Sequence, residues 1–229
     1  MSITNVIEAQ NLVRIFHCGS EKIYAVNDVS IAIKKGSITS IMGPSGSGKS
    51  VLLNILGCLD NPTSGTLKID GQEIFKNGIF LSEDELTKIR RRFFGYVFQR
   101  FFLIPTLTVY ENIILPSAFC KIPEIEKKAE DVMAMLDIAN RRHHLPSQLS
   151  TGQMQRVAIA RALINNPSIL LADEPTGNLD SKRSDEVKQL FLDLNKHRGI
   201  SIIFVTHNPD FAKIGHSLVE ICDGKIVGF

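Results

Sequence analysis

A glycine-rich octapeptide carries the strongest chemical signal in this sequence. It matches the pattern GxxxxGK[ST] in full, with the residues Gly43, Pro44, Ser45, Gly46, Ser47, Gly48, Lys49 and Ser50. Its glycines let the backbone wrap a phosphate chain and aim several N–H groups at it, and a following helix would add the positive end of its dipole. Lys49 supplies a mobile positive charge for the β- and γ-phosphates, and the Ser50 hydroxyl can bind Mg²⁺. The pattern therefore predicts a nucleoside-triphosphate site.

Two carboxylates, Asp173 and Glu174, come directly after the apolar run 169–172. A carboxylate at the end of a buried strand can hold Mg²⁺ through a water molecule. Its neighbour can orient and polarise an attacking water, which is the role of a general base. Alone this pattern is weak, because strands often end in acidic turn residues. In a chain that also carries a phosphate loop, it predicts the catalytic end of a nucleotide site.

The pentapeptide Leu149–Gln153 has two interpretations. Ser150 and Gln153 have the spacing of a capping box, so the segment can simply begin a well-capped helix that runs to about Leu163. Alternatively, it is a second segment that binds phosphate at the start of that helix. Its place shortly before the acidic strand end favours the second interpretation, and both remain open on the residues alone.

Short apolar runs, each followed by turn residues and then by a helical pattern, predict an α/β fold with a mostly parallel sheet covered by helices. A helix is expected from Lys49 to about Leu59, and Asp223-Gly224 predicts a tight turn in a terminal hairpin. Buried strands are expected at 37–42, 168–173 and 200–205, and the hairpin strands at 218–222 and 225–228.

The N-terminal third and the middle of the chain depart from this pattern. Alternating segments near 7–15, 26–33 and 65–69 predict antiparallel strands beside the parallel core. Residues from about 101 to 148 lack buried-strand runs and are predicted to form an inserted helical subdomain, with one helix over 126–138. Ser82 and Glu85 have the spacing of a helix start before a basic run at 88–92, which is either a solvated helix face or a partner contact.

Composition excludes several classes of protein. The chain has 229 residues, of which 44% are hydrophobic and 22% charged, so it is long and apolar enough for one large folded domain. Its 26 basic and 24 acidic residues are too evenly balanced for a protein that coats nucleic acid with charge. The cysteines are far apart and suggest neither a zinc site nor a disulfide framework (Cys18, Cys58, Cys120 and Cys222). With no apolar stretch near the roughly 18–20 residues of a membrane span, we expect a soluble, cytoplasmic protein.

Together these segments resemble the nucleotide-binding subunit of ABC transporters, over essentially the whole chain. Gly43–Ser50 resembles the Walker A loop, Ile169–Asp173 the Walker B strand and Leu149–Gln153 the signature motif. Gln99 stands where the Q-loop begins, residues 177–180 are similar to the D-loop, which ends at Asp180, and His207 matches the switch histidine. The resemblance implies a single domain over 1–229, with the core and antiparallel sheet in 1–98 and 150–229 and a helical subdomain at about 99–149.

The resemblance also implies a mechanism that needs two chains. Two subunits stack head to tail, and Mg-ATP lies between the Walker A loop of one and the signature motif of the other. Ser150 and the backbone N–H groups of Thr151 and Gly152 then hold the partner's γ-phosphate, with Gln153 completing the motif. Glu174 acts as the base on the hydrolytic water, and His207 contacts the γ-phosphate. Gln99 approaches Mg²⁺, which Ser50 also binds and Asp173 holds through water.

Three positions depart from the pattern of the family. Thr151 replaces the first glycine of the usual Leu-Ser-Gly-Gly-Gln motif, which keeps the N–H but adds a branched side chain. Val51 replaces a threonine, and one lost hydrogen bond near the α-phosphate is worth about 0.5–1.5 kcal/mol. The expected adenine platform is Phe16 in place of the commoner tyrosine, with Tyr24 as the alternative. We expect an active ATPase, with slow turnover as one outcome of these changes.

Local segments narrow the resemblance to the lipoprotein-releasing and macrolide-export branch. They are Asn54–Asp60, Leu86–Arg90, Glu111–Pro116 and Asp173–Asp180. The branch implies a separate membrane permease with a large extracytoplasmic domain, a homodimer of this chain through the ATP sites, and a location at the inner face of the cell membrane. A cell-division or regulatory ATPase that signals through a similar permease is the alternative. A GTPase is disfavoured because Asn195–Arg198 has Arg where guanine readers carry Asp.

Overall fold

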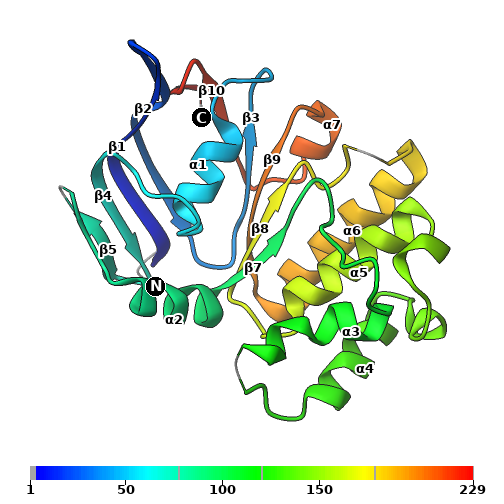
Figure 1. The fold of residues 1–229 in the computed structure, drawn as a ribbon. Coiled ribbons are helices and arrows are strands. Elements are labelled where there is room, and N and C mark those ends of the chain that lie inside the picture. Colours follow the sequence, from blue (N-terminus) through cyan, green and yellow to red (C-terminus); the bar gives the residue numbers. More distant parts are fainter. Residues whose placement is uncertain (1–3, 77, 120, 178, 229) are drawn as a thin grey trace.

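The computed structural model describes residues 4–76, 78–119, 121–177 and 179–228. Cys120 and Asn178, the latter within the predicted D-loop, lie outside these residues. A six-stranded sheet forms the centre of the fold, with the strand order β11-β10-β3-β9-β8-β7 (Figure 1). All its neighbouring strands are parallel except β10 and β11, which form the terminal hairpin. The strands are β3 (Ile38–Met42), β7 (Phe94–Val97), β8 (Ile169–Asp173), β9 (Ser201–Thr206), β10 (Ser217–Cys222) and β11 (Lys225–Gly228).

The predicted parallel strands are thus confirmed to within one residue at each end. Their apolar runs are buried on both faces, as the continuous burial of β9 illustrates. The terminal turn is also confirmed, since Asp223 and Gly224 both have positive φ, at 48° and 75°. Strand β7 was not predicted, because its four residues follow a helix directly and offer no turn residue to separate them.

A second, antiparallel sheet lies beside the first and has the order β2-β1-β4-β5-β6 (Figure 1). It confirms the three predicted alternating segments and extends the first two into long strands. In β2 the buried residues are Val26, Val29, Ile31 and Ile33, so one face of the sheet packs into the core. Its strands are β1 (Asn5–Cys18), β2 (Glu21–Lys34), β4 (Ser64–Ile69), β5 (Gln72–Lys76) and β6 (Ile79–Phe80).

Helices cover both faces of the parallel sheet. Helix α1 (Lys49–Leu56) lies between the two sheets, while α5 (Thr151–Leu163), α6 (Ser181–Arg198) and α7 (Pro209–Ala212) lie on the opposite side (Figure 1). Helix α1 ends three residues earlier than predicted, because Cys58 adopts a left-handed conformation with φ of 58°. Helix α2 (Glu83–Phe93) begins with the predicted capping box of Ser82 and Glu85. Among the described residues, no helix combines the length and apolar character needed to cross a membrane.

Residues 101–148 contain helices and no strand among the part of the segment that the structure describes. The elements are α3 (Val109–Ile114) and α4 (Ile125–Met135), with the short 3-10 turns 115–118, 139–141 and 146–148. Helix α4 begins one residue before the predicted helix and ends three residues before its predicted end. There the N–H groups of Asp137 and Ile138 bond to Ala134 and Met133 rather than continue the helical ladder.

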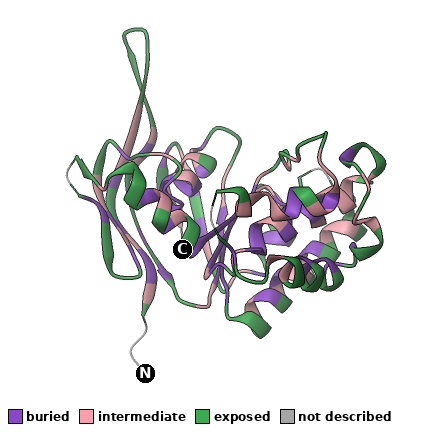
Figure 2. Ribbon diagram, turned by 60° about the horizontal axis from the view of Figure 1, so that its bottom comes forward, coloured by how far each residue is buried: buried purple, intermediate pink, exposed green. Residues whose placement is uncertain are grey.

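Alternate residues of the central strands pack into two apolar cores. Ile41, Leu171 and Ile203 face α1 and the antiparallel sheet. Leu170, Ile202 and Phe204 face the opposite side, where α5 and α6 cover them. Figure 2 shows that buried residues lie inside both halves of the molecule, while the β1–β2 hairpin projects from it and is largely exposed. The sheet is therefore fixed from both faces, which holds its strand ends in place.

The aromatic cluster behind the sheet provides a test of this packing. The Phe204 ring is fully buried, with its centroid 4.8 Å from Phe211 and 6.2 Å from Phe191. Phe204→Ala should lower the free energy of unfolding by about 3–5 kcal/mol, because it leaves a cavity that the sheet cannot close. Phe119→Ala is the control, since Phe119 is 70% exposed and its loss should cost about 0.5 kcal/mol or less. Denaturant unfolding measures both, and equal values would contradict the assigned core.

Candidate nucleotide site

The glycine-rich loop connects the end of β3 to the start of α1, and two of its glycines are required by close backbone contacts. A Cβ atom at Gly43 would lie 2.1 Å from the carbonyl oxygen of Ile221, and one at Gly48 would lie 1.9 Å from that of Ala25. Gly48 also has a φ of 96°, a conformation that residues with a side chain rarely adopt. The neighbouring backbone therefore fixes the shape of the loop.

Lys49 and the first turn of α1 present positive character to the space inside the loop. The Lys49 side chain is buried, and its ammonium donates to the carbonyl oxygens of Gly43 and Pro44, both at 2.8 Å. Gly48 has no side chain with which to cap the first N–H groups of the helix. These N–H groups and the ammonium are the donors that a phosphate chain requires.

Ser50 and Asp173 meet where α1 begins and β8 ends. The Ser50 hydroxyl donates to the Asp173 carboxylate at 2.9 Å. Burial raises the pKa of Asp173, and the adjacent Glu174 charge raises it further, while the Ser50 hydrogen bond and Lys49 partly oppose these effects. A hydroxyl and a carboxylate are the hard oxygen donors that Mg²⁺ prefers, and a cation here would offset the unfavourable charge. The residues present therefore fit the ion.

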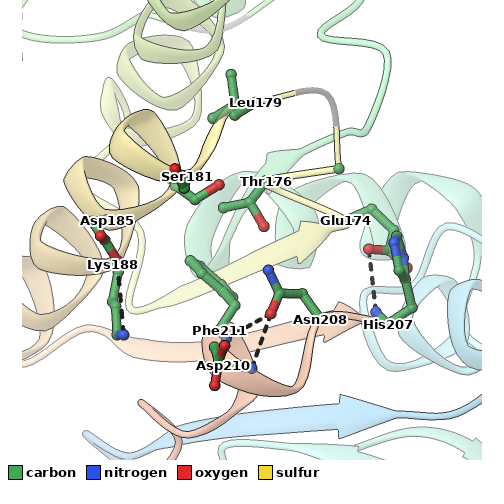
Figure 3. Close-up of a pocket in the computed structure, with 12 residues that line it drawn as sticks. Glu174, Thr176, Leu179, Ser181, Asp185, Lys188, His207, Asn208, Asp210 and Phe211 are labelled. Carbon is green, nitrogen blue, oxygen red and sulfur yellow. Dashed lines mark hydrogen bonds and ion pairs between the residues drawn. The ribbon is translucent and has the colours of Figure 1, made fainter.

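Glu174 and His207 form a pair at the ends of the neighbouring strands β8 and β9. His207 Nδ1 lies 2.9 Å from Glu174 Oε1, and the His207 backbone N–H donates to Oε2 at 3.4 Å (Figure 3). Glu174 itself has a φ of 46°, and its N–H donates to the carbonyl of Val205. A non-glycine residue in this region is strained, and such strain is typical of functional sites. The pair holds the Glu174 carboxylate at the carboxyl end of β8.

A cavity of about 510 Å³ brings together nine of the predicted site residues, from the phosphate loop, the strand ends and Gln99. Its lining consists of Ala25, Ser45, Gly46, Gly48, Lys49, Ser50, Val51, Gln99, Glu174 and His207. Gln99 follows β7, and its Nε2 lies 3.6 Å from the position of a Cβ on Gly177. Ala25 is the one lining residue that the sequence did not suggest, and an isolated alanine in a strand carries no signal of such a role.

A second cavity of about 470 Å³ lies on the other side of the Glu174–His207 pair. It is lined by the pair itself, by residues of the segment 176–188 and by α7, as Figure 3 shows. Asp180 caps α6 by accepting from the Arg183 N–H at 2.9 Å, and Asn208 caps α7. The same two side chains, Glu174 and His207, thus form the boundary between two hollows at the sheet edge.

The segment Leu149–Gln153 does not line the nucleotide cavity. Ser150 Oγ accepts from the Gln153 N–H at 3.3 Å, and Gln153 Oε1 accepts from the Ser150 N–H at 2.9 Å. The capping box is therefore confirmed, with Thr151 as the first residue of α5. Gly152 lines a different hollow, of about 300 Å³, together with residues of α4 and α6. The phosphate-binding interpretation remains a prediction.

The two candidates for the adenine platform lie on the β1–β2 hairpin and point to opposite faces. Tyr24 pairs with Ile15 and Phe16 with Ile23, so adjacent pairs alternate sides. Both aromatic side chains are exposed, and neither lines the nucleotide cavity. The Arg14 guanidinium lies 4.6 Å from the centre of the Phe16 ring. The choice of Phe16 over Tyr24 remains a prediction.

A strand, a glycine-rich phosphate loop, a helix and an acidic strand end on a mostly parallel sheet define a P-loop nucleoside triphosphatase. Comparison with known proteins narrows this class. The profile of the family described as "ABC transporter" matches residues 26–177, which is more than half of the chain. The chain therefore belongs to the ABC transporter family, as one of its ATP-binding proteins, and is an ATPase.

Relatives and solved structures agree with this assignment. The chain is 48% identical to an uncharacterized ABC transporter ATP-binding protein, MJ0796 of Methanocaldococcus jannaschii, over 96% of this chain and 95% of that one. It is 45% identical to a macrolide export ATP-binding/permease protein MacB of Bartonella henselae, over 97% of this chain but 33% of MacB. The dimeric structure of MJ0796, described as an ABC transporter cassette, superposes with a TM-score of 0.89 at 46% identity, covering 97% of both chains. A second structure of that cassette, dimeric and bound to ADP and phosphate, gives a TM-score of 0.88.

The two left-handed glycines of the loop allow a matched test. Gly46 has φ of 80° and open space where a Cβ would stand, whereas a Cβ at Gly48 would meet the Ala25 carbonyl. Gly46→Ala should therefore cost only the conformational strain of about 1–2 kcal/mol. Gly48→Ala should cost more stability and should abolish nucleotide binding, because the loop must move. Thermal unfolding and titration with ADP measure both effects, and equal behaviour of the two variants would contradict the proposed contact.

Because the pKa of Asp173 is raised, we predict that replacing this carboxylate makes the protein more stable but lowers its activity. In the free protein the ionised carboxylate is disfavoured on folding, so Asp173→Asn should raise the free energy of unfolding at pH 7. This gain over the parent should shrink as the pH falls through the pKa of Asp173, because protonation removes the same cost from the parent. ATP hydrolysis should fall about 100-fold or more. Asp185→Asn, at an exposed side chain, should change neither quantity, and a destabilised Asp173→Asn variant would contradict the argument.

Proposed function

We propose that this chain is the motor subunit of an ABC transporter, in which two copies close head to tail around Mg-ATP and drive a separate membrane permease. The separation of the two phosphate-binding segments carries this proposal. The phosphate loop opens into one cavity, while Ser150 and Gly152 at the start of α5 lie outside it. A single chain therefore offers only half of each site, and a second copy would supply the other half. The dimeric structures of MJ0796 support this arrangement.

In this proposal the residues in and beside the cavity have distinct roles. Lys49 and the N–H groups of the loop bind the phosphates, and Glu174 accepts a proton from the attacking water. His207 holds Glu174 in place and contacts the γ-phosphate. Ser50, Gln99 and Asp173 (the last through water) would hold Mg²⁺, which when bound neutralises phosphate charge. From the other copy, Ser150 and the N–H groups of Thr151 and Gly152 would reach the γ-phosphate.

Two of the three departures from the family pattern have a physical account. Thr151 occupies the first turn of α5, where a β-branched side chain is accommodated without disturbing the capping box. Val51 lines the cavity and also packs against the apolar core, so its methyl groups replace a lost hydrogen bond with packing. We propose that the site binds and hydrolyses ATP with both changes present, and that Phe16 supplies the flat apolar surface for adenine.

A groove of about 430 Å³ supports the proposal that this chain binds a membrane partner. It lies between α2, β7, the loop after Gln99 and the end of α5, and Phe102 at its edge is 60% exposed. Arg90 and Arg91 both line it, and Arg91 is exposed. Arg90 also donates to Glu83, Thr87 and the carbonyl of Cys58, so this part of the basic run contributes to the packing of α2 as well as to the groove. We propose that the permease docks here, which places the chain in the cytoplasm at the inner face of the membrane.

The relatives named MacB support the macrolide-export side of the branch that the sequence segments resemble, and we propose the macrolide-export or lipoprotein-releasing branch for this chain. MacB carries a permease in the same chain as its ATP-binding part, and this chain spans a third of its length. On the segments that resemble this branch, we propose a partner permease on a separate chain, with a large extracytoplasmic domain, that exports or extracts lipoprotein, peptide or drug-like substrates. The second candidate is a regulatory or cell-division ATPase acting through a similar permease, and the same groove and ATP site would serve it. We propose that nucleic acid is not among the partners of this chain.

Glu174→Gln tests both the hydrolytic role and the closure of the dimer. Replacing the base with its neutral isostere should lower ATP hydrolysis about 100-fold or more while ATP still binds. The variant should therefore elute as a dimer with ATP and as a monomer without it. Light scattering after size exclusion measures the mass. Glu126→Gln, at an exposed carboxylate in α4, is the matched control and should hydrolyse ATP like the parent. A strictly monomeric Glu174→Gln protein at saturating ATP would contradict the head-to-tail arrangement.

A further inference from the structure

The loop that follows Gln99 contains two adjacent residues in a strained conformation. Phe101 and Phe102 have φ values of 52° and 48°. Bulky aromatic residues rarely adopt this left-handed region, and two in succession require that the surroundings impose it. The Phe102 ring is exposed at the edge of the groove described above and meets Phe98 edge to face, with 5.5 Å between ring centres.

Arg161 of α5 holds the backbone of both residues. One guanidinium nitrogen donates to the carbonyl of Phe102 at 2.6 Å, and the other donates to the carbonyl of Phe101 at 2.5 Å. Burial lowers the pKa of Arg161, and no carboxylate in the described part of the chain pairs with it. An arginine that is desolvated to bind two carbonyl groups is costly unless those bonds are well made. The two bonds therefore fix the loop to α5.

The outer half of the same loop is fixed to a different helix. Asn112 of α3 is fully buried, and its amide donates to the carbonyls of Ile104, Leu107 and Thr108 at 2.9–3.1 Å. Its Oδ1 accepts from the Ile104 N–H at 2.8 Å. Arg161 thus connects the inner half of the loop, next to Gln99, to the helix whose N-cap is Ser150.

Helix α5 is a rigid connection between these two places. It is a single α-helix from Thr151 to Leu163, with Arg161 in its last turn and the capping box at its start. A helix moves as one body over this length, so a displacement at Arg161 also turns the segment Ser150–Gln153. The left-handed pair at one end of the helix and the capping box at the other are therefore held in a fixed relation by α5.

We propose that Arg161 is a positioning residue: by holding the loop after Gln99 in its left-handed conformation, it sets the orientation of Ser150–Gln153 at the other end of α5. This inference rests on the proposed head-to-tail dimer. The two Arg161 bonds fix the carbonyls of Phe101 and Phe102, and α5 relates that position to its own first turn. Gln99, two residues before the pair, lines the other half of the site.

Dimer closure in the Glu174→Gln background tests the inference without the permease. Adding Arg161→Gln removes the charge and leaves a shorter side chain with a single donor nitrogen in place of the two that bind the loop. The ATP-bound dimer should then dissociate about ten-fold more readily or worse, whereas ADP should bind the monomer as in the parent. Amide exchange at residues 101–104 should also become faster. Sedimentation at several protein concentrations, calorimetric titration with ADP and exchange mass spectrometry measure these three quantities.

Two further variants separate positioning from a general loss of stability. Arg161→Lys keeps the charge and one bond, so it should restore part of the closure. Arg198→Gln makes the same arginine-to-glutamine change at an exposed residue in the last turn of α6 and should change neither closure nor exchange. If the Glu174→Gln parent itself stays monomeric with ATP, the proposed function fails and this inference fails with it. If the parent dimerises and the Arg161→Gln variant dimerises equally well, or if ADP binding falls together with closure, the inference alone is overturned.

Discussion

The whole nucleotide site depends on two backbone carbonyls that leave no space for a side chain in the phosphate loop. The carbonyl of Ala25 comes from the antiparallel sheet and that of Ile221 from the parallel sheet, and both approach the loop within the reach of a Cβ. Gly48 and Gly43 are therefore clamped between the two sheets. Because the loop cannot relax, Lys49 and the first N–H groups of α1 point inward before any phosphate arrives, which is the preorganisation that anion binding and catalysis need.

Beside this rigid loop, the end of β8 combines unfavourable electrostatics with backbone strain. Asp173 and Glu174 are adjacent carboxylates at a partly buried strand end, and Glu174 is held left-handed by bonds to β9 and to His207. Such an arrangement costs stability in the empty protein. The central sheet, buried between two apolar cores, supplies that stability. A bound cation and triphosphate would compensate the charge, so the same groups that weaken the free protein favour the loaded one.

Helix α5 shows how one local feature can serve two roles. Its capping box accounts fully for the residues Ser150 and Gln153 as a helix start, which is why the sequence left two interpretations open. The structure confirms the cap and places the start of α5 away from the cavity of its own phosphate loop, so the proposed phosphate role requires a second chain. At its other end Arg161 binds the loop after Gln99. The helix thus connects that loop to the segment for which we propose the phosphate role.

The sequence by itself determined the features whose causes lie within a few residues: the phosphate loop, the capping boxes of α2 and α5, the Asp223-Gly224 turn and the buried strands. It did not determine strand β7, the early end of α1, the role of Ala25 or the bonds of Arg161. These features depend on partners far away in the chain. The hydrogen bond between Ser50 and Asp173 is of the same kind, since the two residues are 123 positions apart. Only the parallel sheet, which gathers the ends of its strands at one edge, brings those partners within hydrogen-bonding distance. The local backbone conformation follows from neighbouring residues. Contacts between groups that are remote in the sequence form only when the sheet has folded.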